Sequence, residues 1–433
     1  MTLPEEFIKE TRTVMGEELF QRFCAALDEE APVSIRLNPF RCSLGDISMA
    51  TKAGNVPWCE MGCYLTERPN FTFDPLLHAG VYYVQEASSM FVYHALKQYV
   101  HEPVQMLDLC AAPGGKTTCA MSALPDGSVL YANEPIRNRA QILSENIQKF
   151  GHPDIIVTNN YPKDYRKSGI MFDVILCDVP CSGEGMFRKD GNAVSEWSLQ
   201  HVAQCQQLQR SIVAEAWQVL KPGGLLIYST CTFNLHENEE NVEWICKEMD
   251  AEMLPVHTEE DWNITGSLKQ DFQQPVYRFI PGKTKGEGLF MAVMRKRDNE
   301  KKGIRERGNK RTWEQGNKRT RERGNDSCRP FTPKHPTNPS FHIVRPTFLE
   351  DLAASGVYVD VDYAQAINYL RREAITLPTD TPRGIVTICY QGHPLGLAKN
   401  IGNRANNLYP KEWRIKSTHI PEEKNIIISL KSL

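Results

Sequence analysis

Short apolar runs alternate with longer segments of helical period between residues 104 and 296 of this 433-residue chain. Each run is bounded by turn-forming residues, and most are followed by an amphipathic segment. Parallel strands need such helical crossovers, so the alternation predicts a parallel sheet wrapped by helices. In chain order, the runs are VQMLDLC, SVLYANE, DIIVTNN, FDVILCDVP and GGLLIYST.

The segment between the last two runs has apolar residues at three- and four-residue spacing, which is typical of a helix with one face in the core. We expect its cysteine, Cys205, to contribute packing only. The predicted buried stripe comprises Val202, Cys205, Leu208, Ile212, Ala216 and Val219.

Charge divides the chain after this region. Residues 301–334 contain 12 Lys/Arg and 4 Asp/Glu, so they carry +8, and the remainder carries −11 of the total −3. The motif GNKRT recurs at 308–312 and 316–320 without an apolar face. Such a segment cannot bury enough surface to fold alone, so residues 299–340 are predicted to form a disordered linker. It either contacts a polyanion or serves only as a solvated tether.

Composition indicates a globular protein of two or three domains, with 41% hydrophobic residues available for a core. The N-terminus has no apolar signal region, and no run is long enough for a membrane helix, so we expect a cytoplasmic protein without membrane contact. Thirteen scattered cysteines fit a reducing compartment. Cys59 and Cys63 resemble half of a metal site, but nothing completes it, so no metal is predicted.

A glycine-containing turn, CAAPGGKTT, follows the first run. Its Gly114 and Gly115 permit a close backbone approach, and the helix that follows offers free N–H groups to a ligand. A phosphate-binding Walker loop would need Gly where Cys110 stands. Glu134 ends the second run, where an acidic side chain suits ribose hydroxyls. These features favour an adenosine-containing ligand without a long phosphate chain, although the glycines alone would also fit helix packing.

Two cysteines follow the fourth and fifth runs in turns of Pro, Ser, Gly and Thr. Cys181 comes shortly after Asp178, and Cys231 follows Thr230. Because ligands bind at the carboxyl ends of parallel strands, both thiols are expected beside the adenosine ligand. A thiolate is a strong nucleophile that suits addition to an electron-poor pyrimidine ring. Taken singly, each cysteine also fits an inert packing role.

The motifs CAAPGGK, DVPCSGEGMFRKD, LKPGGLLIYSTCTF and HENEENV together resemble the Nol/Nop/Sun family of RNA cytosine-5 methyltransferases. The resemblance implies S-adenosyl-L-methionine as cofactor. It also implies that Cys231 is the nucleophile, that Cys181 assists product release and that Asp178 contacts the cytosine. The implied cofactor-binding residues are Cys110, Ala111, Ala112, Pro113, Gly114, Gly115, Lys116, Glu134, Asn160 and Asp178.

The resemblance extends to VSIRLNPFR, VPWC and GVYYVQEASSM upstream, and to GEGLFMAVMRK and LYPKEWRI downstream. It implies a Rossmann-like α/β methyltransferase fold with an N-terminal RNA-binding subdomain (1–100), a catalytic domain (101–298), the basic linker and a small α+β, PUA-like C-terminal domain (341–433). The linker has no counterpart in the family. Relatives usually carry an Asp after the third strand, where this chain has Asn160 or Tyr161.

RNA is the implied partner, most plainly ribosomal RNA of the small subunit, and we expect a monomer. Three alternatives differ in class: a tRNA cytosine-5 methyltransferase, a DNA cytosine methyltransferase and a noncatalytic RNA-binding assembly factor. The second thiol, Cys231, argues against the DNA enzyme, which would not need it. The intact donor loop and both cysteines argue against a noncatalytic protein.

Overall fold

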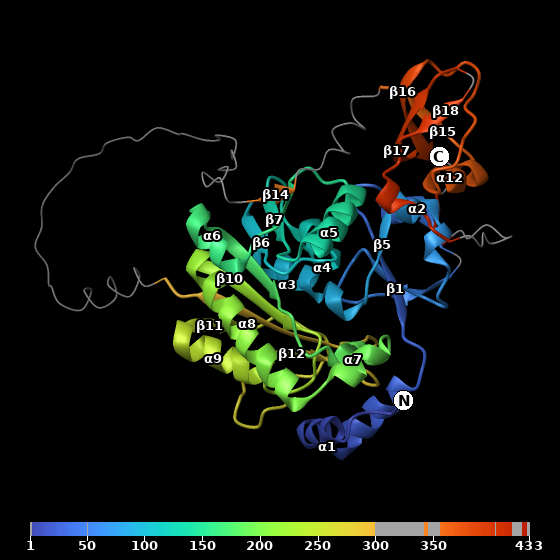
Figure 1. Cartoon of the computed structure of the whole chain (residues 1–433). Helices are drawn as coiled ribbons and strands as arrows, with labels where there is room; N and C mark the ends of the chain where they lie inside the picture. Colours follow the sequence, from blue (N-terminus) through green and yellow to red (C-terminus); the bar gives the residue numbers. More distant parts are fainter. Residues whose placement is uncertain are drawn as a thin grey trace, which may run out of the picture.

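The structure is a computed structural model that describes residues 2–49, 51–298, 342–344, 356–402, 404–417 and 427–430. Most of the chain gathers around one large central sheet, with smaller sheets before and after it in the sequence (Figure 1). The predicted basic linker, residues 299–340, lies outside the described ranges.

The large sheet has nine strands, in the order β11-β13-β10-β9-β6-β7-β8-β14, with β12 paired to β13. Its five central strands are parallel, as the alternating pattern predicted. The chain starts this core at β6 and then builds outward in both directions, so the strand order reverses between β6 and β9. The parallel strands are β6 (Gln105–Asp108), β7 (Val129–Asn133), β8 (Ile155–Thr158), β9 (Phe172–Asp178) and β10 (Leu220–Thr230).

Antiparallel strands complete both sides of this sheet. On one side, β13 pairs with β10 and is itself flanked by β11 and β12. On the other, a two-residue strand that follows the linker, β14, pairs with β8. These strands are β11 (Ala251–Leu254), β12 (Tyr277–Phe279), β13 (Leu289–Lys296) and β14 (Ile343–Val344).

Helices cover both faces of the sheet, because apolar side chains alternate between the faces along each buried strand. On one face, Met106 and Leu176 pack in a core with α3, α4 and α5. On the other, Leu107 and Ile175 pack with α6, α8 and α9. The helices are α3 (Phe91–Tyr99), α4 (Gly115–Ala123), α5 (Arg137–Phe150), α6 (Pro162–Ser168), α8 (Leu199–Val219) and α9 (Glu239–Met249).

The predicted stripe on α8 is correct except at Leu208, which is 47% exposed. The neighbouring Gln209 is fully buried instead. Its amide donates to Pro180 O at 2.9 Å and to Glu237 Oε2 at 2.6 Å. The face of α8 that meets the two cysteine turns is therefore polar. An apolar-periodicity rule cannot anticipate this substitution, since the hydrogen-bond partners come from distant turns.

The N-terminal region combines helix α1 (Glu5–Leu27) with a four-stranded sheet in the order β3-β4-β1-β5. Gly16 interrupts α1 with φ of +74°, and α1 packs near α7 (Gly191–Glu196). A short helix, α2, and strand β2 complete the region. The bounds are β1 (Val33–Leu37), β2 (Ile47–Ser48), β3 (Lys52–Asn55), β4 (Gly62–Leu65), α2 (Pro75–His78) and β5 (Tyr82–Val84).

The C-terminal region forms a sheet in the order β15-β16-β17-β18, and both strands predicted from GIVTICY and PLGLAKN are present. It packs on the N-terminal sheet, sharing one apolar core that includes Ile35 and Ile388. The bounds are β15 (Tyr358–Asp360), α12 (Tyr363–Leu370), β16 (Gly384–Tyr390), β17 (His393–Asn400), β18 (Ala405–Asn407) and β19 (Ser429–Leu430), the last of which pairs with β2.

Cys59 and Cys63 are buried and pack in two different apolar cores. Within the described ranges, no group of three or more His, Cys, Asp or Glu side chains is placed to hold a metal ion. None of the helices in those ranges is long and apolar enough to cross a bilayer.

Candidate active site

A cleft of about 530 Å³ opens at the carboxyl ends of β6 and β9, where the strand order reverses. Crevices at such a reversal are the usual ligand sites of open parallel sheets. The walls come from the turn after β6, the turns after β9 and β10, the strand β5 and residues just before β13. The cleft therefore lies between the N-terminal sheet and the large central sheet.

The CAAPGGK turn lines this cleft. At both of its glycines a larger side chain would be sterically unfavourable. Gly114 has φ of +114°, a conformation that L side chains avoid. A Cβ atom on Gly115 would lie 3.2 Å from the Tyr83 ring. Both positions thus keep the backbone close to its neighbours.

Helix α5 holds the same turn from behind. Asn146 Nδ2 donates to Pro113 O at 2.7 Å, and Arg139 donates to Ala112 O at 3.1 Å. Two carbonyls of the turn are therefore satisfied by side chains, and the turn is fixed before any ligand binds. Such preorganisation reduces the entropic cost of binding.

Lys116 and Asp178 form an ion pair across the cleft. Lys116 Nζ donates to Asp178 Oδ2 at 2.9 Å, and Ser229 Oγ donates to Asp178 Oδ1 at 2.7 Å. Burial lowers the pKa of Lys116. The charge of Asp178 and its hydrogen bond outweigh this effect, so the pKa of the lysine is raised. Cys231 also favours the charged lysine electrostatically. The cleft thus holds a fixed cation beside a carboxylate and a thiol.

The two thiols that the sequence predicted to lie close together, Cys181 and Cys231, are in contact. Cys181 Sγ lies 3.2 Å from Cys231 Sγ, within hydrogen-bond distance for sulfur. This contact and burial raise the pKa of Cys181 well above its usual value. Cys181 therefore keeps its proton and can donate it toward Cys231. Cys231 lines the cleft, whereas Cys181 is not among the lining residues.

Gly185 locks the Cys231 turn in place. Its N–H donates to Cys231 O at 2.7 Å, and a Cβ atom at this position would lie 2.7 Å from the same oxygen. Real Cβ atoms do not approach a carbonyl so closely, so only glycine fits here without a shift of the backbone. The GEG motif after β9 thus sets the position of the thiol after β10.

Two buried glutamates support both cysteine turns. Glu237 Oε2 accepts from Ser182 N at 3.0 Å, and Glu184 Oε2 accepts from Phe233 N at 2.6 Å. Asn234 Nδ2 donates to both glutamates. Burial raises the pKa of Glu237. The HENEENV motif therefore acts as scaffolding for the thiols.

Asp108 is a cleft residue that sequence reasoning missed. It ends β6, is fully buried and accepts from Thr117 Oγ1 at 2.6 Å. Its other oxygen has no hydrogen-bond partner in the described part of the chain. Burial raises the pKa of Asp108 to about 7, although the Thr117 hydroxyl opposes this. The signal was the lone carboxylate within the apolar run VQMLDLC.

Glu134 lies directly after β7, as predicted, with its carboxylate 2% exposed. Oε1 accepts from Ile136 N at 2.9 Å, and Oε2 lies 3.4 Å from Arg139 Nη1. Glu134 is not among the lining residues of the cleft, whereas Arg139 is. The predicted ribose contact stays a prediction.

Asn160 contacts the strand that follows the linker. Its Nδ2 donates to His342 O at 3.0 Å, and its Oδ1 accepts from His342 N at 3.0 Å. The residue is 4% exposed, whereas the neighbouring Tyr161 is 61% exposed. Both ends of the Asn160 amide are engaged, and its predicted donor contact stays a prediction.

The N-terminal sheet supplies a cleft wall that no motif spacing could reveal. Tyr83, Gln85 and Glu86 of the YYVQEASS stretch line the cleft. Glu86 accepts from Ser88 N and Ser89 N, both at 2.9 Å, so its carboxylate is held in place. The only signal in the sequence was the run of polar residues that directly follows an apolar strand.

Family comparisons agree with this architecture along the chain. The family described as 16S rRNA methyltransferase RsmB/F matches residues 95–295. The N-terminal domain of 16S rRNA methyltransferase RsmF matches residues 3–87, and the RsmF PUA domain matches residues 357–415. The chain is therefore similar to the RsmB/F family in all three parts. This similarity agrees with the resemblance seen in the sequence motifs.

Individual RsmB/F relatives are similar over much of the chain. The ribosomal RNA small subunit methyltransferase F of Pectobacterium atrosepticum is 33% identical over 309 residues, which are 68% of this chain and 63% of the relative. The protein of the same name from Escherichia coli O139:H28 is 34% identical over 310 residues, with the same two coverages. The chain thus aligns with less than two thirds of these relatives' length.

Solved structures agree with the fold. A methyltransferase homolog protein from Pyrococcus horikoshii is 26% identical, with a TM-score of 0.55, over 68% of this chain and all of that one. NSun6 from Pyrococcus horikoshii, solved with SFG, is 21% identical, with a TM-score of 0.58, over 68% of this chain and 98% of that one. The Rossmann-like methyltransferase sheet predicted for this chain is confirmed.

Proposed function

We propose that this protein transfers a methyl group from S-adenosyl-L-methionine to C5 of a cytosine in RNA, through a covalent bond between Cys231 and C6 of the base. The observation that carries the proposal is the 3.2 Å contact between two thiols, beside the Lys116–Asp178 pair in one cleft. A packing role does not require two thiols, a lysine and a carboxylate to converge where ligands bind.

The residues around the turn after β6 suit the methyl donor. The free oxygen of Asp108 offers a buried acceptor for an ammonium group, and the glycines keep the floor open. Glu134 would accept hydrogen bonds from the ribose hydroxyls. Exposed Ile136 and Tyr161 follow β7 and β8 and provide apolar surface for an adenine ring. S-adenosyl-L-methionine, when bound, supplies an electrophilic methyl group.

The first chemical task is to make C5 nucleophilic. Addition of the Cys231 thiolate forms an S–C6 bond, and the electron pair of the C5–C6 double bond becomes available at C5. Charge develops at N3 during this addition. Asp178 would contact the base, and the Lys116 ammonium that it holds at 2.9 Å would stabilise that charge from a fixed position. The target base must leave its stack to reach the cleft.

The second task is to restore the aromatic ring. After C5 has taken the methyl group, its proton must leave, so that the electron pair returns to the ring and the S–C6 bond breaks. Cys181, held against Cys231, can return a proton to the departing sulfur or position a water that removes the C5 proton. The two thiols would therefore act at different steps.

Ribosomal RNA of the small subunit is the proposed substrate, because relatives named small subunit methyltransferase F match along the chain. The match of residues 357–415 to the PUA domain of RsmF supports an RNA partner. We further propose that the protein acts as a monomer in the cytoplasm. A tRNA substrate is the alternative, and methylation assays on purified small subunits, 16S rRNA and tRNA separate the two.

Removal of each thiol tests the chemistry. Cys231→Ala should abolish methylation and form no covalent adduct, since C5 is never activated. Cys181→Ala should transfer the methyl group but release RNA slowly, so that a protein–RNA species resistant to denaturing electrophoresis accumulates with donor present. Cys205→Ala, which alters a buried thiol outside the cleft, is the matched control. A persistent adduct in Cys231→Ala would assign the nucleophile to Cys181, and full activity in both variants would refute the thiol mechanism.

A further inference from the structure

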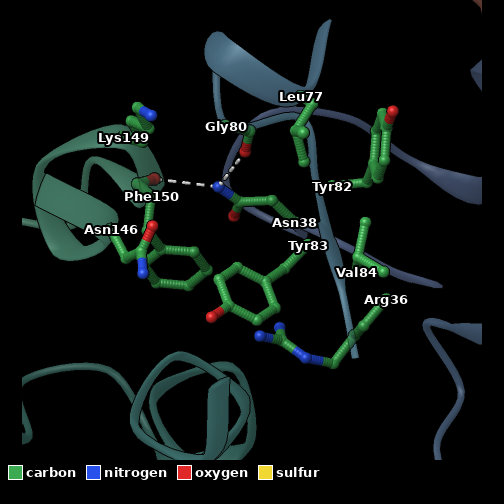
Figure 2. Close-up of a pocket in the computed structure, with 10 residues that line it drawn as sticks. All are labelled: Arg36, Asn38, Leu77, Gly80, Tyr82, Tyr83, Val84, Asn146, Lys149 and Phe150. Atoms are coloured by element: carbon green, nitrogen blue, oxygen red, sulfur yellow. Dashed lines mark hydrogen bonds between the residues drawn. The ribbon is translucent and has the colours of Figure 1, made fainter. Parts of the chain in front are cut away.

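A second cavity, of about 230 Å³, lies between the N-terminal sheet and helix α5 (Figure 2). Strands β1 and β5 contribute one wall, and the C-terminal half of α5 contributes the other. This cavity is separate from the candidate active site, but Tyr83 and Val84 line both. Strand β5 is thus the partition between them.

Arg36 brings a positive charge to this cavity. The side chain is 1% exposed, and its three nitrogens donate to Gln85, Ser122 and Thr118, which are all neutral. Within the described part of the chain, no carboxylate lies within 4.0 Å of its guanidinium. Buried charges in proteins are normally paired, because desolvation is costly. An unpaired buried cation that lines a cavity indicates an anionic ligand.

The other lining groups indicate an aromatic ring attached to that anion. The rings of Tyr83 and Phe150 lie next to the Arg36 guanidinium in Figure 2, and the guanidinium carbon is 5.9 Å from the Phe150 ring centre. Asn146 lies beside Phe150; its Nδ2 already donates to Pro113 O at 2.7 Å, so its Oδ1 is the group that could accept from a base. Lys149, 17% exposed and paired with Glu145 at 2.5 Å, also lines the cavity.

Aromatic rings, an amide and buried positive charge are the groups with which proteins recognise an unstacked ribonucleotide. The rings stack on the base, an amide reads its edge, and the cation takes the phosphate. The cavity volume of about 230 Å³ suits a group of about the size of one nucleotide and is too small for a helical segment. A purely apolar ligand would leave the charge of Arg36 unpaired.

The location fits a strand that crosses β5. A third cavity, of about 540 Å³, includes Arg68 and Lys189 and shares Val84 and Glu86 with the active-site cleft. The cleft for the target base therefore adjoins both a groove with two basic residues and the Arg36 cavity, and all three share Val84. A single RNA strand could fill all three in succession.

We infer that the Arg36 cavity binds a ribonucleotide of the RNA substrate close to the target cytosine, with its base against Tyr83 and Phe150 and its phosphate toward Arg36. The assignment of this nucleotide to an RNA substrate rests on the proposed function, whereas the binding of a nucleotide in the cavity does not. The cavity would thereby select the sequence around the methylated base.

Saturation-transfer NMR on the full chain tests this inference. The probes are AMP, GMP, CMP and UMP, with saturating S-adenosylhomocysteine present so that the donor site is filled. We expect transfer to the base protons of at least one nucleotide, and at least roughly tenfold weaker binding of the matching nucleoside, which lacks the phosphate. Leu77→Trp, which fills the cavity, should weaken the nucleotide by a similar factor.

Leu44→Trp is the matched control, because Leu44 is exposed, lies in the same region and does not line the cavity. If Leu77→Trp does not fold, Lys149→Glu, which reverses a charge on the wall, takes its place. Equal binding in wild type and the filled variant would overturn the site, as would the absence of any nucleotide signal. If 16S rRNA fragments failed to displace the nucleotide, the assignment of the cavity to the RNA substrate would be overturned. Wild-type methyl transfer, measured separately, reports on the proposed function alone.

Discussion

Asp108 offers a test in which the direction of a pH effect is fixed by the structure. The carboxyl group is fully buried at the end of β6, with Thr117 as its hydrogen-bond donor and one oxygen free. Burial raises its pKa from an ordinary value of 3.8 to about 7. The folded protein therefore holds this proton at a pH where the unfolded chain has lost it.

This difference links stability to pH. A change from 3.8 to about 7 corresponds to roughly 4 kcal/mol between the two protonation states. The folded state binds more protons than the unfolded state between these values, so the free energy of unfolding decreases as the pH rises from about 4 to about 7. Above pH 7 the full cost of the buried carboxylate is present, and below pH 4 none of it is.

Asp108→Asn removes the titration and keeps an oxygen that can accept from Thr117. Each kcal/mol moves the Tm of a domain of this size by roughly 2–4 °C. The cost of about 4 kcal/mol at pH 8 corresponds to a variant that melts roughly 8–16 °C above wild type. At pH 5 only about 1.6 kcal/mol of this cost is present, so the difference in Tm should shrink to roughly 3–6 °C. Thermal unfolding at pH 5, 6, 7 and 8 measures the difference, with the exposed Asp126→Asn as control. An offset that is the same at pH 5 and pH 8 would refute the reasoning.

Two further predictions concern the donor and the thiol. Glu134→Ala should weaken S-adenosyl-L-methionine binding by roughly 1–3 kcal/mol through lost hydrogen bonds to a charged group; calorimetry decides, and unchanged affinity in a folded variant would remove Glu134 from the site. Gly185→Ala should push against Cys231 O, which lies 2.7 Å from the added Cβ, and lower kcat roughly 10–100-fold. Gly191→Ala, where the added Cβ meets nothing within 4 Å, should leave kcat unchanged in single-turnover assays.

The parallel core was predictable because its signals are local. Apolar runs bounded by turn residues locate β6 to β10, and helical periodicity locates α8. The error at Leu208 has a long-range cause, because the polar side chain of Gln209 is buried only where it meets Pro180 and Glu237. Periodicity reports which face is usually apolar, and it cannot see partners from other turns.

The proximity of the two thiols could be predicted because strand ends of a parallel sheet share an edge, although only Cys231 lines the cleft. What the sequence could not predict is the wall contributed by β5, since pairing of β5 with β1 depends on contacts between segments far apart in the chain. The same limit hid Arg36, whose partners Thr118 and Ser122 lie in α4. The motif VSIRLNPFR that contains Arg36 gave no indication that its charge is buried.

Asn160 joins the end of β8 to the residue before β14. Its amide donates to His342 O and its carbonyl accepts from His342 N, next to the ladder between β8 and β14. The motif resemblance led us to expect an Asp at this place. A carboxylate could accept but not donate, so it would leave that carbonyl facing a negative charge. His342 is the first described residue after the predicted basic linker. The carboxamide therefore suits this contact better than a carboxylate would, and we expect any donor contact from this turn to come from the exposed Tyr161.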